Sequence, residues 1–243
     1  TILAESNSLS LNLSGAHIVL SVSLMISIVL CYHNFWQSKS RKWFVFLSIL
    51  SLLLGFIHLF DVITLMLAFG LHTAWRLISK EETLGNAIKH HLAYGIVMLA
   101  PFVYTYALYG NIYYFKEWNA QNLLETPKLL QVISGYFLPL IFCMIYLLFK
   151  IIRKERFSSM ESLLFLWIAS GFALLYSPLN IQRRFIEGLN IPIMILGSMG
   201  LLRAVLPSVE KVLHGFIKIK IKKRHLNAAL VVLVMALICP SSL

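Results

Sequence analysis

The chain has 243 residues, of which 59% are hydrophobic and 13% are charged, and its mean hydropathy is +0.80. Soluble domains are about 45–50% apolar and about 25% charged, so this composition excludes an ordinary soluble domain and is typical of a polytopic membrane protein. The formal net charge of +11 comes from 21 Lys and Arg against 10 Asp and Glu. These basic residues follow the connections between apolar segments and form no patch interleaved with aromatic residues, so we expect no nucleic-acid partner.

Apolar runs of about 20 residues are long enough to cross a hydrocarbon core of about 30 Å as helices. We expect eight such spans, with seven to nine compatible, near residues 15–35, 43–57, 59–78, 90–109, 132–152, 160–177, 191–206 and 225–240. The second is short and runs almost directly into the third, as a hairpin or as a broken helix with a re-entrant turn. The sequence therefore predicts an all-α, polytopic transmembrane helix bundle that forms a single transmembrane domain over residues 1–243.

The ends of the chain and its cysteines carry further expectations. The chain starts at Thr1, and its first residues lack the basic region and apolar core of a signal peptide, so we expect a fragment without its N-terminal spans. The three cysteines are isolated from one another and from histidines at ligand spacing, so neither disulfides nor structural zinc is expected.

The basic residues are concentrated on one side of the predicted bundle. Seventeen of the 21 fall in the connections 36–42, 76–89 and 150–156 and in the segment 203–224. By the positive-inside rule these segments are cytoplasmic, and residues 207–224 form a basic cytoplasmic segment. We therefore expect an integral protein of a prokaryotic cytoplasmic (inner) membrane, with membrane lipids as partners.

Arg183 and Arg184 are predicted on the opposite, extracytoplasmic side, between two apolar runs. Two guanidinium groups at headgroup level can form bidentate hydrogen bonds with a phosphate or pyrophosphate. Gln182 and Glu187 could orient them, and Arg183 and Glu187 would pair at i,i+4 on a helix. The alternative is that both arginines extend to lipid phosphates or that one simply pairs with Glu187.

Asp61 lies in the apolar stretch GFIHLFDVITLML, three residues after His58. A carboxylate without a partner in hydrocarbon costs about 2.5–3.5 kcal/mol, so Asp61 is expected to face a cavity or a partner. A His–Asp pair can form a structural hydrogen bond, bind substrate or contribute to a metal site. Two ligands do not hold a metal without others, and the sequence identifies none, so no cofactor is evident and a divalent metal is left open.

Other polar residues predicted on the extracytoplasmic side are candidates for substrate binding. The stretch 110–130 combines aromatic residues of the interfacial type with polar ones, which fits either a membrane-interface belt or a loop that faces a saccharide. The substrate-binding candidates are Glu5, Asn7, His17, His58, Asp61, Trp118, Asn119 and Asn122.

Four stretches resemble a group of uncharacterised prokaryotic polytopic membrane proteins that are similar to C-type, lipid-sugar-dependent glycosyltransferases. AESNSLSLNLSGAHIVLSVSLMI resembles their loop-and-span segment, with Ala16-His17 in place of Pro-His. LLGFIHLFDVITL resembles their Gly-x-x-His-Pro-Tyr-Asp hairpin, with Leu59-Phe60 in place of Pro-Tyr. EWNAQNLLETPKLLQVISGYFLPL resembles their Asn-rich outer loop, and YSPLNIQRRFIEGLNIPIMILGSMGL their Gln-Arg-Arg-x-x-Glu-Gly-x-x-Ile-Pro block.

The resemblance implies an enzyme that transfers a sugar, with inversion, from a polyprenyl-phosphate donor at the extracytoplasmic face. It places the catalytic acidic residue upstream of Thr1, so the catalytic residue of this chain is unknown. It also implies that Arg183 and Arg184 bind the phosphate of the donor. Two alternatives remain open: a transporter or flippase of a lipid-linked saccharide, and a non-catalytic lipid-binding bundle.

Overall fold

The computed structural model describes residues 16–121, 126–177, 182–209 and 211, which contain helices and turns but no strand. For Ala16, residues 118–121, Gln182 and Arg183 only the backbone is described. The chain divides into two compact units: unit 1 consists of residues 1–13, 127–164 and 190–243, and unit 2 of residues 14–126 and 165–189. The single transmembrane domain stays a prediction, and most of the predicted basic segment 207–224 lies outside the described residues.

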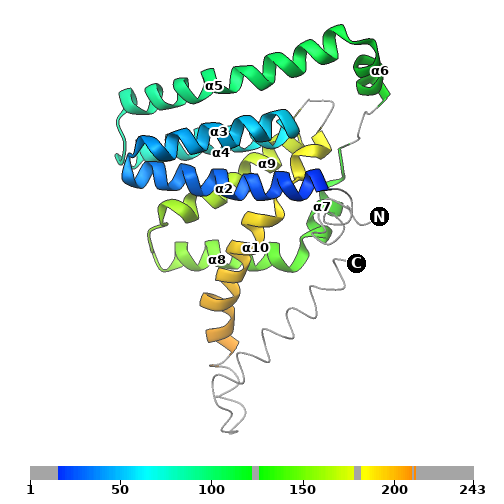
Figure 1. Cartoon of the computed structure of the whole chain (residues 1–243). Helices are drawn as coiled ribbons and strands as arrows, with labels where there is room; N and C mark the ends of the chain where they lie inside the picture. Colours follow the sequence, from blue (N-terminus) through cyan, green and yellow to red (C-terminus); the bar gives the residue numbers. More distant parts are fainter. Residues whose placement is uncertain (1–15, 122–125, 178–181, 210, 212–243) are drawn as a thin grey trace. The chain divides into compact units, whose positions relative to one another are not determined.

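Unit 2 is built on three helices that pack side by side, with a fourth laid against them (Figure 1). A fifth, short helix packs back on the fourth. In chain order these are α2 (Ala16–Ser38), α3 (Arg41–Ile57), α4 (Leu59–Ile78), α5 (Leu84–Asn111) and α6 (Tyr113–Gln121). Of the two alternatives for this stretch, a hairpin and a broken helix with a re-entrant turn, the structure shows two helices that pack on each other, and α3 ends and α4 begins on either side of His58.

Small residues allow α3 and α5 to approach each other closely. A Cβ atom on Gly55 would lie 2.8 Å from Cγ of Pro101, which is buried inside α5. On the same pair of helices, the hydroxyl group of Tyr94 donates a 2.8 Å hydrogen bond to Oγ of Ser51. Close backbone approach and interhelical hydrogen bonds are what hold helices together where lipid removes the hydrophobic driving force.

Lysine residues occupy the left-handed backbone region just after three helices. Lys39 follows α2, Lys80 follows α4 and Lys154 follows α8 (Phe137–Ile152), with φ angles of 51°, 58° and 54°. Glycine is the usual residue at this position because it has no Cβ to clash. A lysine there keeps the turn and adds a positive charge beside the carbonyl end of the helix dipole.

Unit 1 contains α7 (Leu129–Gly135), α8, the first turns of α9 (Ser159–Leu175), α10 (Asn190–Gly200) and the π-helix η3 (Leu201–Val205). Helix α10 packs directly on α8, because Gly197 and Gly200 have no side chain at the contact. A Cβ atom at these positions would lie 2.7 Å from the carbonyl oxygen of Pro139 and 2.0 Å from that of Phe142. The predicted span 132–152 is not one straight helix: α7 and α8 meet at an angle of 88°. Proline fits the first turn of a helix, and Pro139 stands in the first turn of α8, just after the bend.

Four helices of the described residues are long and apolar enough to cross a membrane, or five if the bent α7–α8 pair counts as one span. The eight spans of the sequence analysis are therefore not confirmed, and the predicted span 225–240 lies outside the described residues. Helix α5 carries an exposed apolar stripe on one face, formed by Ile88, Leu92, Ile96, Leu99 and Val103. A continuous stripe of this kind is consistent with an integral membrane protein whose helix faces lipid.

Candidate functional site

The first part of the candidate site is the junction between α3 and α4. His58 interrupts the helical backbone with φ −150° and ψ 82°, and Asp61 follows in the first turn of α4. A carboxylate in the first turn is favoured by the positive end of the helix dipole. The Nδ1 atom of His58 lies 3.2 Å from Oδ2 of Asp61, so the predicted His–Asp pair is present.

The second part is the segment that follows the two arginines. Residues Gln182–Ile186 form a 3-10 helix, and a turn follows in which Gly188 has a φ of +77°. The positive φ angle favours glycine here, and a Cβ atom on Gly188 would also lie 2.6 Å from Sδ of Met25, whose side chain would have to move. Phe185, Ile186 and Leu189 are completely buried and fix this turn in the core of unit 2.

These two parts meet through Glu187 and His58. The Oε2 atom of Glu187 lies 3.3 Å from Nε2 of His58. The imidazole ring thus contacts one carboxylate through each of its nitrogens. The side chains of His58, Asp61 and Glu187 are 8%, 2% and 11% exposed, so the cluster is almost closed to solvent.

A cluster of two carboxylates in such surroundings needs a compensating positive charge. Burying a carboxylate without a partner is costly, and the usual outcomes are protonation, pairing or coordination of a metal. Within the described part of the chain, the Oδ1 atom of Asp61 has no hydrogen-bond partner. Each of the three residues offers one ligand atom, and these atoms lie within 4.8 Å of one another.

Arg184 brings a cation to the edge of the cluster. Its guanidinium carbon lies 5.3 Å from the centre of the Phe60 ring, a cation–π arrangement. The Phe60 ring in turn packs edge-on against Phe185, with centroids 6.1 Å apart, and against His58, at 5.8 Å. The Phe60 ring therefore supports the guanidinium group, and Phe185 and His58 pack against that ring. A guanidinium group held in this way is suited to bind an oxyanion through parallel N–H donors.

The structure brings four of the predicted site residues together: His58, Asp61, Arg184 and Glu187. It places Glu187 against His58. The prediction that Glu187 also orients the arginines stays a prediction. Pairing of Arg183 with Glu187 stays a prediction, because the side chains of Gln182 and Arg183 lie outside the described part.

The remaining candidates stand elsewhere or are not described. His17 is exposed in the first turn of α2 and is not among the three clustered ligands. Trp118 and Asn119 belong to α6 by their backbone, and their side chains are not described. Glu5, Asn7 and Asn122 lie outside the described residues.

Sequence reasoning missed two contributors to this site. In the sequence, Phe60 was noted only because it replaces the Tyr of the Pro-Tyr pair in the resembled group. In the structure, the guanidinium group of Arg184 lies over its ring. Gly188 follows Glu187 directly and sets the turn that places it. A glycine next to a charged residue between apolar runs is a turn signal that could have pointed to this geometry.

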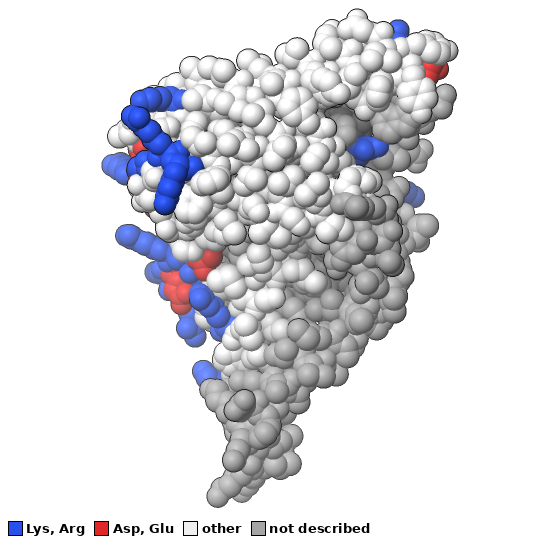
Figure 2. Space-filling model, in the orientation of Figure 1, with Lys and Arg blue, Asp and Glu red and all other residues white. Residues whose placement is uncertain are grey.

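The site and most basic residues of unit 2 lie at opposite ends of the same helices. Lys39, after α2, donates a hydrogen bond to Glu82, before α5, which ties the two basic connections together. Blue side chains gather at that end of unit 2 in Figure 2. His58 lies at the other end of α3, whose 17 residues are about 26 Å long at 1.5 Å per residue. This separation is the one expected if unit 2 spans a membrane.

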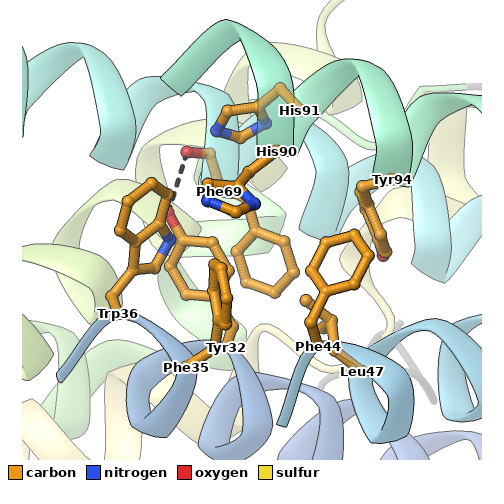
Figure 3. Close-up of a pocket in the computed structure, with 9 residues that line it drawn as sticks. All are labelled: Tyr32, Phe35, Trp36, Phe44, Leu47, Phe69, His90, His91 and Tyr94. Carbon is orange, nitrogen blue, oxygen red and sulfur yellow. Dashed lines mark hydrogen bonds between the residues drawn. The ribbon is translucent and has the colours of Figure 1, made fainter. Parts of the chain in front are cut away.

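Unit 2 also contains a cavity that lies nearer the end with the basic connections and is lined mainly by aromatic rings (Figure 3). The hydroxyl group of Tyr32 lies 3.2 Å from the carbonyl oxygen of Phe69 and 3.1 Å from Oγ1 of Thr73, which in turn lies 2.6 Å from Nε2 of His91. The polar atoms around this cavity are thus connected to one another. None of the predicted site residues lines it; its lining residues are Tyr32, Phe35, Trp36, Phe44, Leu47, Phe69, His90, His91 and Tyr94.

Unit 1 holds another buried polar cluster, which the sequence analysis did not identify. The carboxylate of Glu161 accepts a hydrogen bond from the hydroxyl group of Tyr146 and lies 3.3 Å from Nζ of Lys150. An Nη atom of Arg203 donates a 3.2 Å hydrogen bond to the same hydroxyl group. Two cations therefore face one carboxylate, and the cluster links α8, α9 and η3 as a structural element.

Comparisons with protein-family models, with curated proteins and with solved structures find no match to this chain. The functional interpretation therefore rests on the geometry of the site and on the chemistry of its residues.

Proposed function

We propose that this protein is a membrane glycosyltransferase-like protein of the C type, which transfers a sugar from a polyprenyl-phosphate donor at the extracytoplasmic face. One observation carries the proposal. The stretch GFIHLFD at the α3–α4 junction and the stretch QRRFIEG after α9 meet at one buried polar site. These are two of the stretches on which the resemblance to such transferases rests, and they are far apart in the sequence.

Arg184 has the chemistry to bind the donor phosphate. When the acceptor hydroxyl oxygen attacks the anomeric carbon, it gives its proton to a base, the bond between that carbon and the phosphate oxygen breaks, and the polyprenyl phosphate leaves with its negative charge. A fixed guanidinium group stabilises that charge as it develops. Arg184 is supported by Phe60, and Arg183 and Gln182 precede it in the same 3-10 helix. We assign these three residues to phosphate binding.

The His58–Asp61–Glu187 cluster lies beside this arginine and contributes charge and shape to the pocket of the donor. The basic connections at the far end of unit 2 favour an orientation in which that end is cytoplasmic. In this orientation Arg184 lies at the extracytoplasmic boundary, where the headgroup of a lipid-linked donor is found. The cytoplasmic membrane of a prokaryote contains such donors, so we assign the protein to that membrane.

An assay of donor cleavage tests the proposal. Purified protein in detergent micelles is incubated with undecaprenyl-phosphate-linked hexoses, and released undecaprenyl phosphate is measured. We expect release with the unchanged protein and a loss of about 100-fold or more with Arg184→Ala, the size seen when one charge-stabilising donor is removed from a transition state. Arg184→Lys keeps the charge but not the bidentate geometry, and should recover part of the rate.

Arg153→Ala is the matched control, because Arg153 also lies over a phenylalanine ring, with its guanidinium carbon 4.3 Å from the centre of Phe149, but belongs to unit 1. It should leave release unchanged. Release that is equally fast with Arg184→Ala contradicts the proposal. Movement of the intact lipid-linked sugar across a vesicle membrane, without release, would favour the transporter or flippase instead.

A further inference from the structure

We infer that His58, Asp61 and Glu187 form a binding site for one divalent metal ion of the Mn²⁺ type. The existence of the metal site does not depend on the proposed function. The role of the ion rests on that function: in it, the ion would hold a phosphate oxygen of the donor next to Arg184.

The first argument is the spacing of the ligands. One nitrogen of His58 and one carboxylate oxygen each of Asp61 and Glu187 lie within 4.8 Å of one another. Bonds from a metal to imidazole nitrogen and carboxylate oxygen are about 2.0–2.2 Å long, which puts neighbouring ligand atoms roughly 3.0–3.6 Å apart. Because Nδ1 of His58 faces Asp61 and Nε2 faces Glu187, the imidazole ring must turn so that one nitrogen points to both carboxylates, and the two carboxylates must then close the remaining distance.

Asp61 has an unsatisfied, buried carboxylate. Its side chain is 2% exposed, and Oδ2 lies 3.2 Å from Nδ1 of His58. An imidazolium ion at His58 would leave Oδ1 of Asp61 without a hydrogen-bond donor from the described residues. A divalent ion bound by a neutral imidazole would give the Asp61 carboxylate a direct ligand bond and compensate its charge. A metal ion therefore satisfies the buried carboxylate of Asp61 better than a proton on His58 does.

The donor set has one nitrogen and two oxygens. Ca²⁺ and Mg²⁺ are bound mainly through oxygen, whereas divalent transition metals also bind imidazole nitrogen, and Mn²⁺, which favours carboxylates, binds such a site more weakly than Zn²⁺. Three protein ligands leave at least one coordination position open. An open position next to a guanidinium group is suited to an anionic oxygen, such as that of a phosphate.

Uptake of Mn²⁺ by the purified, EDTA-treated chain in detergent micelles tests the inference, with free Mn²⁺ measured by electron paramagnetic resonance. We expect one Mn²⁺ per chain, displaced by Zn²⁺. Asp61→Asn and Glu187→Gln preserve shape and remove one ligand charge each, and should weaken binding by at least 10-fold to 100-fold. Glu81→Gln is the control, because Glu81 is exposed and outside the cluster, and it should bind as the unchanged protein does.

A second readout needs no variant. Bound Mn²⁺ should show coupling to a ¹⁴N nucleus in pulsed paramagnetic resonance, because His58 supplies a ligand nitrogen, and Mn²⁺ should raise the melting temperature. The inference is overturned if the unchanged chain takes up no Mn²⁺, if bound Mn²⁺ shows no nitrogen coupling, or if Asp61→Asn and Glu187→Gln both fold and bind Mn²⁺ normally.

Binding of undecaprenyl phosphate in the presence of EDTA separates this inference from the proposed function. If the chain binds the lipid phosphate but no Mn²⁺, the metal site is wrong and the phosphate site stands. If it binds Mn²⁺ with nitrogen coupling but no lipid phosphate, the metal site stands and the proposed function is wrong.

Discussion

Nε2 of His58 lies 3.3 Å from Oε2 of Glu187, although the helices α4 to α9 separate the two residues in the sequence. This contact joins the start of α4 to the turn after the two arginines. It depends on the backbone of the turn, because Glu187 is held between the buried residue Ile186 and the left-handed residue Gly188. The site therefore depends on backbone geometry as much as on charge.

Gly188→Ala should destabilise unit 2 and displace Glu187. An alanine there would hold a positive φ angle and put its Cβ atom 2.6 Å from Sδ of Met25. A strained backbone of this kind costs about 1–3 kcal/mol, so thermal unfolding in detergent should begin at a lower temperature. Gly70→Ala is the control, because nothing lies within 4 Å of a Cβ atom at Gly70 and alanine favours the helix. Equal melting temperatures for the two variants would contradict the turn geometry.

Gly200→Ala should weaken the packing of α10 on α8 in unit 1. A Cβ atom on Gly200 would lie 2.0 Å from the carbonyl oxygen of Phe142, and a backbone atom cannot rotate away. Forcing such helices apart costs about 1–3 kcal/mol. The loss is measured as a drop in melting temperature relative to Gly95→Ala, whose Cβ atom would meet open space in α5. If both variants melt like the unchanged protein, α8 and α10 do not pack as described.

Glu161→Gln should strongly destabilise unit 1. The carboxylate of Glu161 is buried and pairs with Lys150, so its removal leaves the buried ammonium group with the half-exposed Glu155 as its remaining charge partner. Breaking one side of a buried pair costs about 3–5 kcal/mol. Glu155→Gln removes a half-exposed carboxylate 3.7 Å from the same Lys150 and should cost about 0–1 kcal/mol. Chemical unfolding measures the free energy of unfolding of both variants. A similar decrease in the two variants would show that the cluster around Glu161 is not closed to solvent.

Stability should depend on pH through Glu82. Burial raises the pKa of this carboxyl group, but the hydrogen bonds from Lys39 and from the backbone N–H of Thr83 outweigh it, and the pKa falls below its ordinary value of 4.5. A group whose pKa is lowered by folding stabilises the folded state above its ordinary pKa, and this stability is lost as pH falls through the lowered pKa.

Glu82→Gln should therefore have a lower melting temperature than the unchanged protein at pH 7. The difference between the two melting temperatures should shrink as pH falls below 4.5. It should also shrink in high salt, because Lys39 is about half exposed. Melting curves from pH 3 to pH 7 measure the difference. A gap that widens in acid would mean that folding raises this pKa instead.

The sequence predicted the long helices of unit 2 well, because hydropathy and helix breaks are local properties, but α6 forms within the stretch 110–130, for which no helix was predicted. The predicted spans 43–57 and 59–78 begin and end within two residues of α3 and α4, and the break between them falls at His58. The His58–Asp61 pair follows from spacing along one chain segment. The contact of His58 with Glu187 does not follow from spacing. This contact depends on how the turn after the arginines packs on α2, where Gly188 faces Met25. The bend between α7 and α8 could not be predicted from the sequence either. Pro139 is compatible both with a transmembrane helix that continues through it and with a new helix that starts just before it.

Binding of undecaprenyl phosphate to the purified chain in detergent micelles with EDTA, followed by native mass spectrometry, tests the central claim most directly. The account predicts that the unchanged protein and Arg153→Ala bind the lipid phosphate equally, and that Arg184→Ala binds it at least about 10-fold more weakly, since a charge-assisted hydrogen bond contributes about 1.5–3 kcal/mol. Equal binding by Arg184→Ala and the unchanged protein would contradict a phosphate site at the junction of the α3–α4 turn and the Arg183–Glu187 segment.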